Sequence, residues 1–141
     1  MKKCLVDKCP TCNKGDLEIS KETWNDLTGI SSDRVKIDWD FVPCTNVIDT
    51  TQPAKLAIRQ GSNRWWFAFQ VSNTVNPIQS LKLLNNKKWI TLERQSDGFW
   101  EGTYDAGLTF PVVVVVYDYS IGTTTYSHTL TSIPDIAVIN F

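Results

Sequence analysis

Two adjacent tryptophans, Trp65 and Trp66, are the residues whose type and spacing first point to a chemistry. They open an apolar segment in which Phe67, Phe69 and Val71 alternate with smaller or polar residues, a pattern that predicts a half-buried strand. Neighbouring residues of a strand point to opposite faces, so one sheet face cannot bury both indoles. Trp66 falls on the outward face. Trp65 shares the inward parity, and we expect a bulge or twist at the preceding Gly-Ser-Asn turn to expose it.

An exposed indole suits the binding of sugars. The ring is a large apolar plane with a negative quadrupole, and it stacks on the C–H groups that a pyranose presents on its face. Covering about 100 Å² of ring contributes roughly 2.5 kcal/mol. Three such contacts, less the cost of association, predict a Kd of roughly 10 μM to 1 mM for a single site. The alternative is packing, with Trp65 capping the end of the core and Trp66 lying flat on the sheet.

Four cysteines offer a second chemistry. Cys4, Cys9 and Cys12 show the C-x4-C-x2-C spacing of a plant-type iron–sulfur site, and Cys44 follows further along the chain. Such a site needs small residues between the cysteines so that backbone N–H groups surround the sulfurs, whereas residues 5–8 are typical of a strand. A zinc site lacks the second C-x2-C pair that would complete it. We therefore predict no metal and no other cofactor.

Nucleophilic catalysis has no support in the sequence. His128 is the single histidine, and it lies in a predicted strand of alternating threonine and tyrosine. No Ser/His/Asp or Cys/His set accompanies it, so we interpret it as an exposed or hydrogen-bonded strand residue.

The second part of the chain is predicted to consist of short strands. Turn-forming residues separate them at regular intervals, and Asp97-Gly98 is the clearest hairpin signal. Short strands with regular turns and no helical period predict an immunoglobulin-like β-sandwich. The predicted strands are Lys55–Gln60, Arg64–Ser72, Ser80–Leu84, Trp89–Arg94, Phe99–Tyr104, Pro111–Tyr119 and Thr123–Thr131.

The first part of the chain is short and mixed. Ser20 is predicted to cap a short helix that runs to about Leu27 and ends at Gly29. Apolar and charged residues alternate over Val35–Phe41, which predicts a strand with one solvated face. Lys3–Val6 is a further strand candidate.

The composition excludes several classes of partner. The 141 residues carry a net charge of −1, which gives no electrostatic footprint for nucleic acid or an anionic membrane. The longest apolar run, Val112 to Val116, is far shorter than the roughly 20 residues that span a bilayer. The basic opening of the chain is followed by no apolar stretch of signal-peptide length. We predict a monomer that binds no nucleic acid and inserts into no membrane.

Four short motifs in the strand region carry a family resemblance. They are Gly61-Ser62-Asn63-Arg64-Trp65-Trp66, Gln70-Val71-Ser72-Asn73, Pro77-Ile78 and Lys88-Trp89-Ile90. From about Lys55 to Pro134 the sequence resembles the second domain of expansins, which is classed as a carbohydrate-binding module. Residues 6–20 and the stretch that ends at Pro43 resemble the last part of the family's first domain, a double-psi β-barrel.

The resemblance implies an all-β protein in two parts. Residues 1–44 are an incomplete double-psi β-barrel segment, residues 45–54 a polar linker, and residues 55–141 a carbohydrate-binding β-sandwich. By this resemblance, the first residues of the chain correspond to a late part of the family's barrel domain. Expansins are secreted and loosen cell walls without hydrolysing them. The resemblance therefore implies a secreted, extracellular protein that binds cellulose or a similar β-glucan and is not an enzyme.

The resemblance also assigns roles to single residues. Trp65 and Trp66 correspond to binding aromatics of the family, and Arg59 stands where relatives carry a basic residue. The family's third aromatic normally sits in the hairpin that is Asp97-Gly98 here, so we expect Phe99 to take its place.

Two acidic residues match the groove of the family's barrel, Asp7 and Glu18. Hydrolysis of a glycoside requires two carboxyl groups that flank the scissile bond, and expansins lack the second one. We therefore expect no catalytic residue and no glycosidase activity. A secreted family also implies disulfides, and we expect one that links Cys44 to Cys9 or Cys12.

Three functions are compatible with the sequence. The first is expansin-like loosening of contacts between wall or matrix polymers. The second is a carbohydrate-binding module without loosening activity, because loosening in the family needs both domains. The third is an Ig-like domain that binds a protein, with the tryptophans as hot spots.

Overall fold

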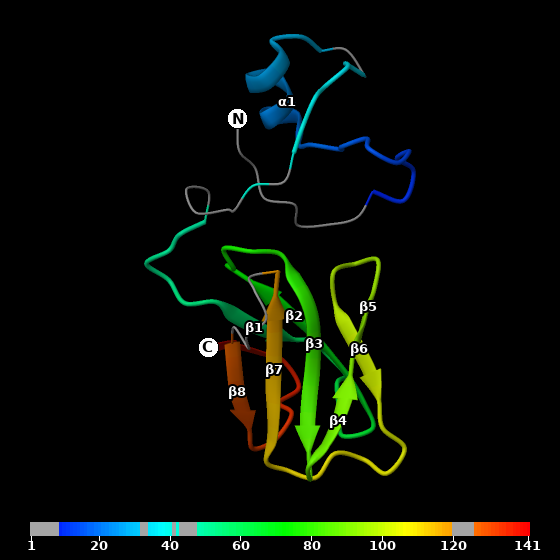
Figure 1. The fold of residues 1–141 in the computed structure, drawn as a ribbon, viewed down its shortest axis with the longest axis vertical. Helices are drawn as coiled ribbons and strands as arrows, with labels where there is room; N and C mark the ends of the chain where they lie inside the picture. Colours follow the sequence, from blue (N-terminus) through cyan, green and yellow to red (C-terminus); the bar gives the residue numbers. More distant parts are fainter. Residues whose placement is uncertain (1–8, 32–33, 41, 43–47, 120–125) are drawn as a thin grey trace.

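Two antiparallel sheets make up most of the protein. The computed structural model describes residues 9–31, 34–40, 42, 48–119 and 126–141. One sheet has the strand order β5-β6-β2-β1-β9 and the other the order β4-β3-β7-β8; the four-stranded sheet lies in front in Figure 1. The strands are β1 (Lys55–Ile58), β2 (Trp66–Ser72), β3 (Ile78–Asn85), β4 (Lys88–Thr91), β5 (Glu93–Arg94), β6 (Trp100–Thr103), β7 (Val112–Asp118), β8 (Tyr126–Leu130) and β9 (Ala137–Asn140).

The predicted all-β sandwich is confirmed, and alternation along the strands explains it. Phe67 and Phe69 on β2 are fully buried, and their ring centroids lie 6.0 Å apart. They belong to the same core cluster as Leu81 and Leu83 on β3 and the alternate valines of β7, which are Val112, Val114 and Val116. Each sheet thus buries one face and leaves the other to solvent, as period-2 patterns require.

Most predicted strands are present with ends shifted by one or two residues, and the strand assignment differs more strongly at two places. The predicted strand Trp89–Arg94 divides into β4 and β5, which lie in different sheets, because the chain crosses between the sheets at Leu92. Leu92 is buried, and its N–H donates to the carbonyl of Leu81 at 3.0 Å. The second difference is β9, which the sequence reading did not predict and which pairs with β1.

The predicted short helix is confirmed as α1 (Lys21–Thr28), which lies outside the two sheets in Figure 1. The hydroxyl of Ser20 accepts a hydrogen bond from the N–H of Thr23 at 3.3 Å, and Gly29 ends the helix in the left-handed region with φ of 65°. In the part of the chain that the structure describes, no helix is long and apolar enough to cross a membrane.

The predicted strand Val35–Phe41 is wrong for the described residues 34–40, which have no regular structure. Ile37 and Trp39, expected to be half-buried, are 42% and 40% exposed. A strand is stable only beside a partner that accepts its backbone hydrogen bonds, and no described strand lies next to this segment. The predicted strand Lys3–Val6 lies outside the described residues. The division of the chain into a barrel segment, a linker and a β-sandwich stays a prediction.

Candidate functional site

The start of β2 is held by two side chains of the preceding turn. The Asn63 side-chain oxygen accepts hydrogen bonds from the N–H groups of Trp65 at 2.9 Å and Trp66 at 3.1 Å. The buried hydroxyl of Ser62 accepts from the N–H of Ala68 at 3.1 Å. β2 therefore begins at Trp66, and Trp65 lies in the bend before it, 55% exposed. The expected exposure of Trp65 is confirmed, and the bend replaces the expected bulge or twist.

A second turn, residues 104–107, supports Trp65 from the other side. The N–H of Tyr104 donates to the carbonyl of Trp65 at 2.9 Å, and the N–H of Leu108 donates to the carbonyl of Arg64 at 2.7 Å. Gly107 has a φ of 71°, and a Cβ there would lie 3.0 Å from the indole nitrogen of Trp65 and 2.6 Å from Nε of Arg64. The absence of a side chain at Gly107 is what lets the indole approach this turn so closely.

Trp66 is half-buried on the outer face of its sheet, as expected. Its cross-strand partner on β6 is Thr103, and the next outward residue of β2, Ala68, is paired with Glu101. On the other side of Ala68 lies Arg59, whose N–H donates to the Ala68 carbonyl at 3.0 Å. Directly paired residues share a face, so these side chains form a row on the outer face of the sheet.

Arg59 reaches across this row. Its Nη1 lies 2.7 Å from a carboxylate oxygen of Glu101, so the ion pair passes over Ala68. Ala68 is fully buried although it belongs to the outer face, and only a small side chain leaves room for the bridge above it. Arg59 also forms an ion pair with Asp97. The hydrogen bond from Arg59 and one from the N–H of Phe99 hold the pKa of Asp97 below its usual value of 3.8.

Arg59 also packs over the ring of Phe99, the third predicted binding aromatic. The guanidinium carbon of Arg59 lies 4.2 Å from the centroid of the Phe99 ring, so one face of this half-buried ring is covered by a cation. Trp100, the other aromatic after the turn, is a core residue with 7% exposure. Phe99 therefore presents a combined ring and guanidinium in place of a bare ring. We call Trp65, Trp66, Arg59 and Phe99 the aromatic surface.

The predicted barrel acids and cysteines lie in the first part of the chain. Cys9 and Cys12 are joined to each other by a disulfide, so the expected link from Cys44 to either of them is wrong. Cys9 and Cys12 are three positions apart in the sequence, so their disulfide closes a short local loop. Glu18 is exposed, with a carboxylate oxygen within 4.8 Å of both sulfurs, but the disulfide leaves no thiolate there to join it as a metal ligand. Asp7 and Cys44 lie outside the described residues.

Comparison with known proteins shows a sequence similarity over part of the chain. No family model matches the chain. Expansin-YoaJ from Bacillus subtilis is 27% identical over 90 residues, which cover 64% of this chain and 37% of that protein. The chain is expansin-like over this part of its length. It spans well under half of the relative that it matches.

Two solved structures are similar to the expansin-like chain. One is the apo form of the Clavibacter michiganensis expansin, with 25% identity and a TM-score of 0.47 over 59% of this chain and 39% of that one. The other is a point mutant of the same expansin in complex with cellohexaose, with 26% identity and a TM-score of 0.46 over 58% of this chain and 38% of that one.

Sequence reasoning named the rings of the expansin-like segment but missed the residues that hold them. Asn63 was visible as a turn residue just before an apolar strand, the usual context of a side chain that binds the backbone two residues on. Glu101 has the same outward parity as Trp66 and Phe99 once the strand pairing is known. No local pattern links Arg59 to Glu101, because 42 residues separate them.

Proposed function

We propose that this expansin-like chain binds cellulose or a related β-glucan without cleaving it, and that the aromatic surface is the binding site. The observation that carries the proposal is Trp65, which is 55% exposed although the turns at Asn63 and Gly107 hold it in place. A large apolar ring fixed at the surface gains from covering a sugar and loses little conformational entropy on binding.

The polar groups of the surface also suit a sugar. Arg59, Asp97 and Glu101 are each partly exposed, and together they offer charged donors and acceptors beside the rings. Hydrogen bonds in which one partner is charged are stronger than neutral ones, so these groups are able to bind hydroxyls at the edge of a sugar that stacks on the rings. The combination of flat apolar rings with planar polar groups matches a pyranose, which is apolar on its faces and polar around its rim.

Loosening of wall or matrix contacts is the finer form of the proposal. The chain aligns with a minor part of the length of an expansin, so binding without loosening is the alternative. We further propose that the protein acts outside the cell, where matrix glycans lie, and that it releases no reducing ends from glucan. A paper-weakening or wall-creep assay separates loosening from binding, and reducing ends that rise with added protein would contradict the non-enzymatic part.

Retention on insoluble cellulose tests the binding itself. We expect wild-type protein to deplete from solution and the variant Trp65→Ala/Trp66→Ala to stay in the supernatant. Trp89→Ala is the matched control, because Trp89 is 50% exposed but belongs to β4 in the other sheet. Circular dichroism and thermal melting verify that all variants fold. Equal retention of wild type and double variant would overturn the proposal and leave a protein ligand as the better reading of the tryptophans.

A further inference from the structure

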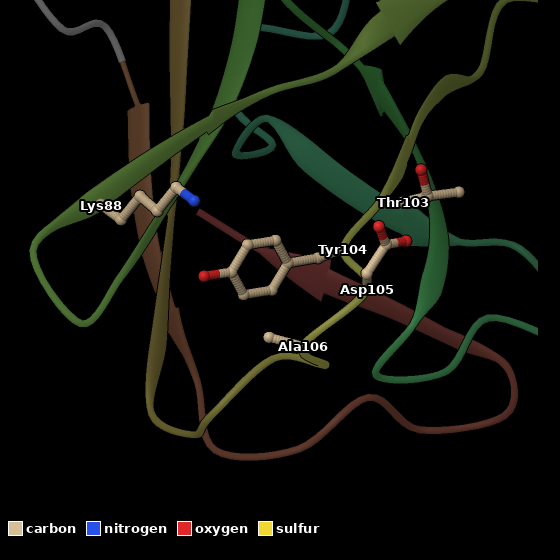
Figure 2. A pocket seen from close by; sticks show the side chains of 5 residues that line it. All are labelled: Lys88, Thr103, Tyr104, Asp105 and Ala106. Carbon is tan, nitrogen blue, oxygen red and sulfur yellow. The ribbon is translucent and has the colours of Figure 1, made fainter.

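A hollow of about 370 Å³ opens beside the aromatic surface, between the edges of the two sheets. Its lining comes from Lys88 at the start of β4 and from residues 103–106 at the end of β6 (Figure 2). Thr103 is the cross-strand partner of Trp66, and the N–H of Tyr104 binds the carbonyl of Trp65 at 2.9 Å. The hollow therefore adjoins the residues that pair with Trp66 and bond to the backbone of Trp65.

The position of the hollow continues the line of the aromatic surface. Glu101 and Thr103 share the outer face of β6, because they are paired with the outward residues of β2, and Phe99, which directly precedes β6, has the same parity. Phe99 stands at one end of this line and the hollow at the other. Two residues along a strand advance by about 6.6 Å, so the distance from Phe99 to Thr103 is about 13 Å. Thr103 ends this line and also lines the hollow, so the aromatic surface and the hollow adjoin at Thr103.

The chemistry of the lining fits a neutral, hydroxyl-rich unit. Figure 2 shows the ammonium of Lys88 pointing toward the ring of Tyr104, with the Asp105 carboxylate and the Thr103 hydroxyl on the far side of that ring. Nζ of Lys88 lies 5.2 Å from the ring centroid. Within the described residues, neither Lys88 nor Asp105 takes part in an ion pair or a side-chain hydrogen bond.

We propose that this hollow is a further sugar subsite, which binds one neutral sugar unit of the glycan chain that lies on the aromatic surface. The proposal rests on the function proposed above and extends its site along β6. Lys88 donates to hydroxyl oxygens, Asp105 accepts from hydroxyl groups, and the ring of Tyr104 between them adds apolar contact. One cation and one anion at the same hollow cancel in charge, so an anionic sugar attracted by Lys88 is repelled by Asp105.

Affinity as a function of chain length tests the subsite. Titration calorimetry with soluble β-1,4-glucan oligosaccharides from three to six units should show affinity that rises with length. The variants Lys88→Met and Asp105→Ala should lose about three- to tenfold in affinity for the six-unit ligand, the equivalent of a hydrogen bond or less, and little for the three-unit ligand. Lys82→Met is the control, since Lys82 lies on β3, packs over Tyr117 and does not line the hollow.

Amide NMR spectra locate the effect independently of affinity. Signals of Lys88, Asp105 and Ala106 should shift with the six-unit ligand and stay unchanged with the three-unit ligand. If the tryptophan variants abolish binding while the Lys88 and Asp105 variants keep the full length dependence, the subsite is refuted and the aromatic surface stands. If wild-type protein binds no oligosaccharide and no cellulose, both proposals fail together.

Discussion

Arg59 and Phe99 form one unit: the guanidinium carbon lies 4.2 Å from the centroid of the ring, while its nitrogens bind Asp97 and Glu101. The two carboxylates hold the guanidinium plane over the ring, so what this end of the aromatic surface offers to a ligand is a planar cation supported by an aromatic ring. Guanidinium is weakly hydrated and flat, and both properties favour contact with a sugar.

The first prediction concerns the shape of this cation. Arg59→Lys keeps the charge but loses the planar fork that binds both carboxylates, so we expect it to weaken binding to cellohexaose about as much as Arg59→Ala, roughly three- to tenfold. Thermal stability should change little in both variants, because the ion pairs lie at the surface. Calorimetric titration and melting curves measure the two effects, and full affinity in the lysine variant would contradict the planar-cation account.

The second prediction is a pH dependence of binding. The Arg59 hydrogen bond lowers the pKa of Asp97 below 3.8, so the contribution of the pair is fully present above that pH and is lost only as pH falls through the lowered pKa. Cellulose retention should therefore be flat from neutral pH to about 4 and decline below it. The variant Asp97→Asn should retain less protein at neutral pH and show a weaker decline. A midpoint near neutral pH would point to a different titrating group.

The third prediction tests the close approach of Gly107 to Trp65. Gly107→Ala adds a Cβ beside the indole nitrogen and beside Arg64 at a φ of 71°, so we expect lower stability and weaker retention on cellulose. Gly61→Ala is a matched control, because its φ is 84° but a Cβ there meets nothing within 4 Å. Both variants should lose about 1 kcal/mol from backbone strain. Retention should fall in the Gly107 variant alone; equal retention in the two would show that Trp65 does not depend on this turn.

The fourth prediction concerns the turn before β2. Asn63→Ala removes the acceptor for the N–H groups of Trp65 and Trp66, which should cost about 1–2 kcal/mol and speed hydrogen exchange at both amides. Asn63→Asp keeps a side-chain oxygen in the same place and should preserve most of the protection. Exchange rates measured by NMR distinguish the two variants, and equal protection in all three proteins would rule out a role for this side chain.

The fifth prediction separates the disulfide from the binding site. Peptide mapping after alkylation under non-reducing conditions should find Cys9 and Cys12 joined to each other. The variant Cys9→Ser/Cys12→Ser should bind cellulose like wild type, because neither residue belongs to the sheet that carries the aromatic surface. A peptide in which Cys44 is joined to Cys9 or Cys12 would instead restore the pairing expected from the family resemblance.

The sequence by itself determined the features that depend on neighbours along the chain. The alternation at Phe67 and Phe69 was enough to identify a core strand, and Ser20 with Gly29 was enough to bound the helix, because each signal acts within a few residues. The outward position of Trp66 followed from the same local rule, whereas the exposure of Trp65 comes from the bend that precedes β2.

Only the tertiary structure decided which distant residues meet. It joined Arg59 to Glu101 over Ala68, seated Trp65 against Gly107, and left residues 34–40 without a strand because no partner lies beside them. Alternation states which way a side chain points, but strand register decides what it meets. Register comes from pairing segments that lie far apart in sequence, which no local pattern encodes.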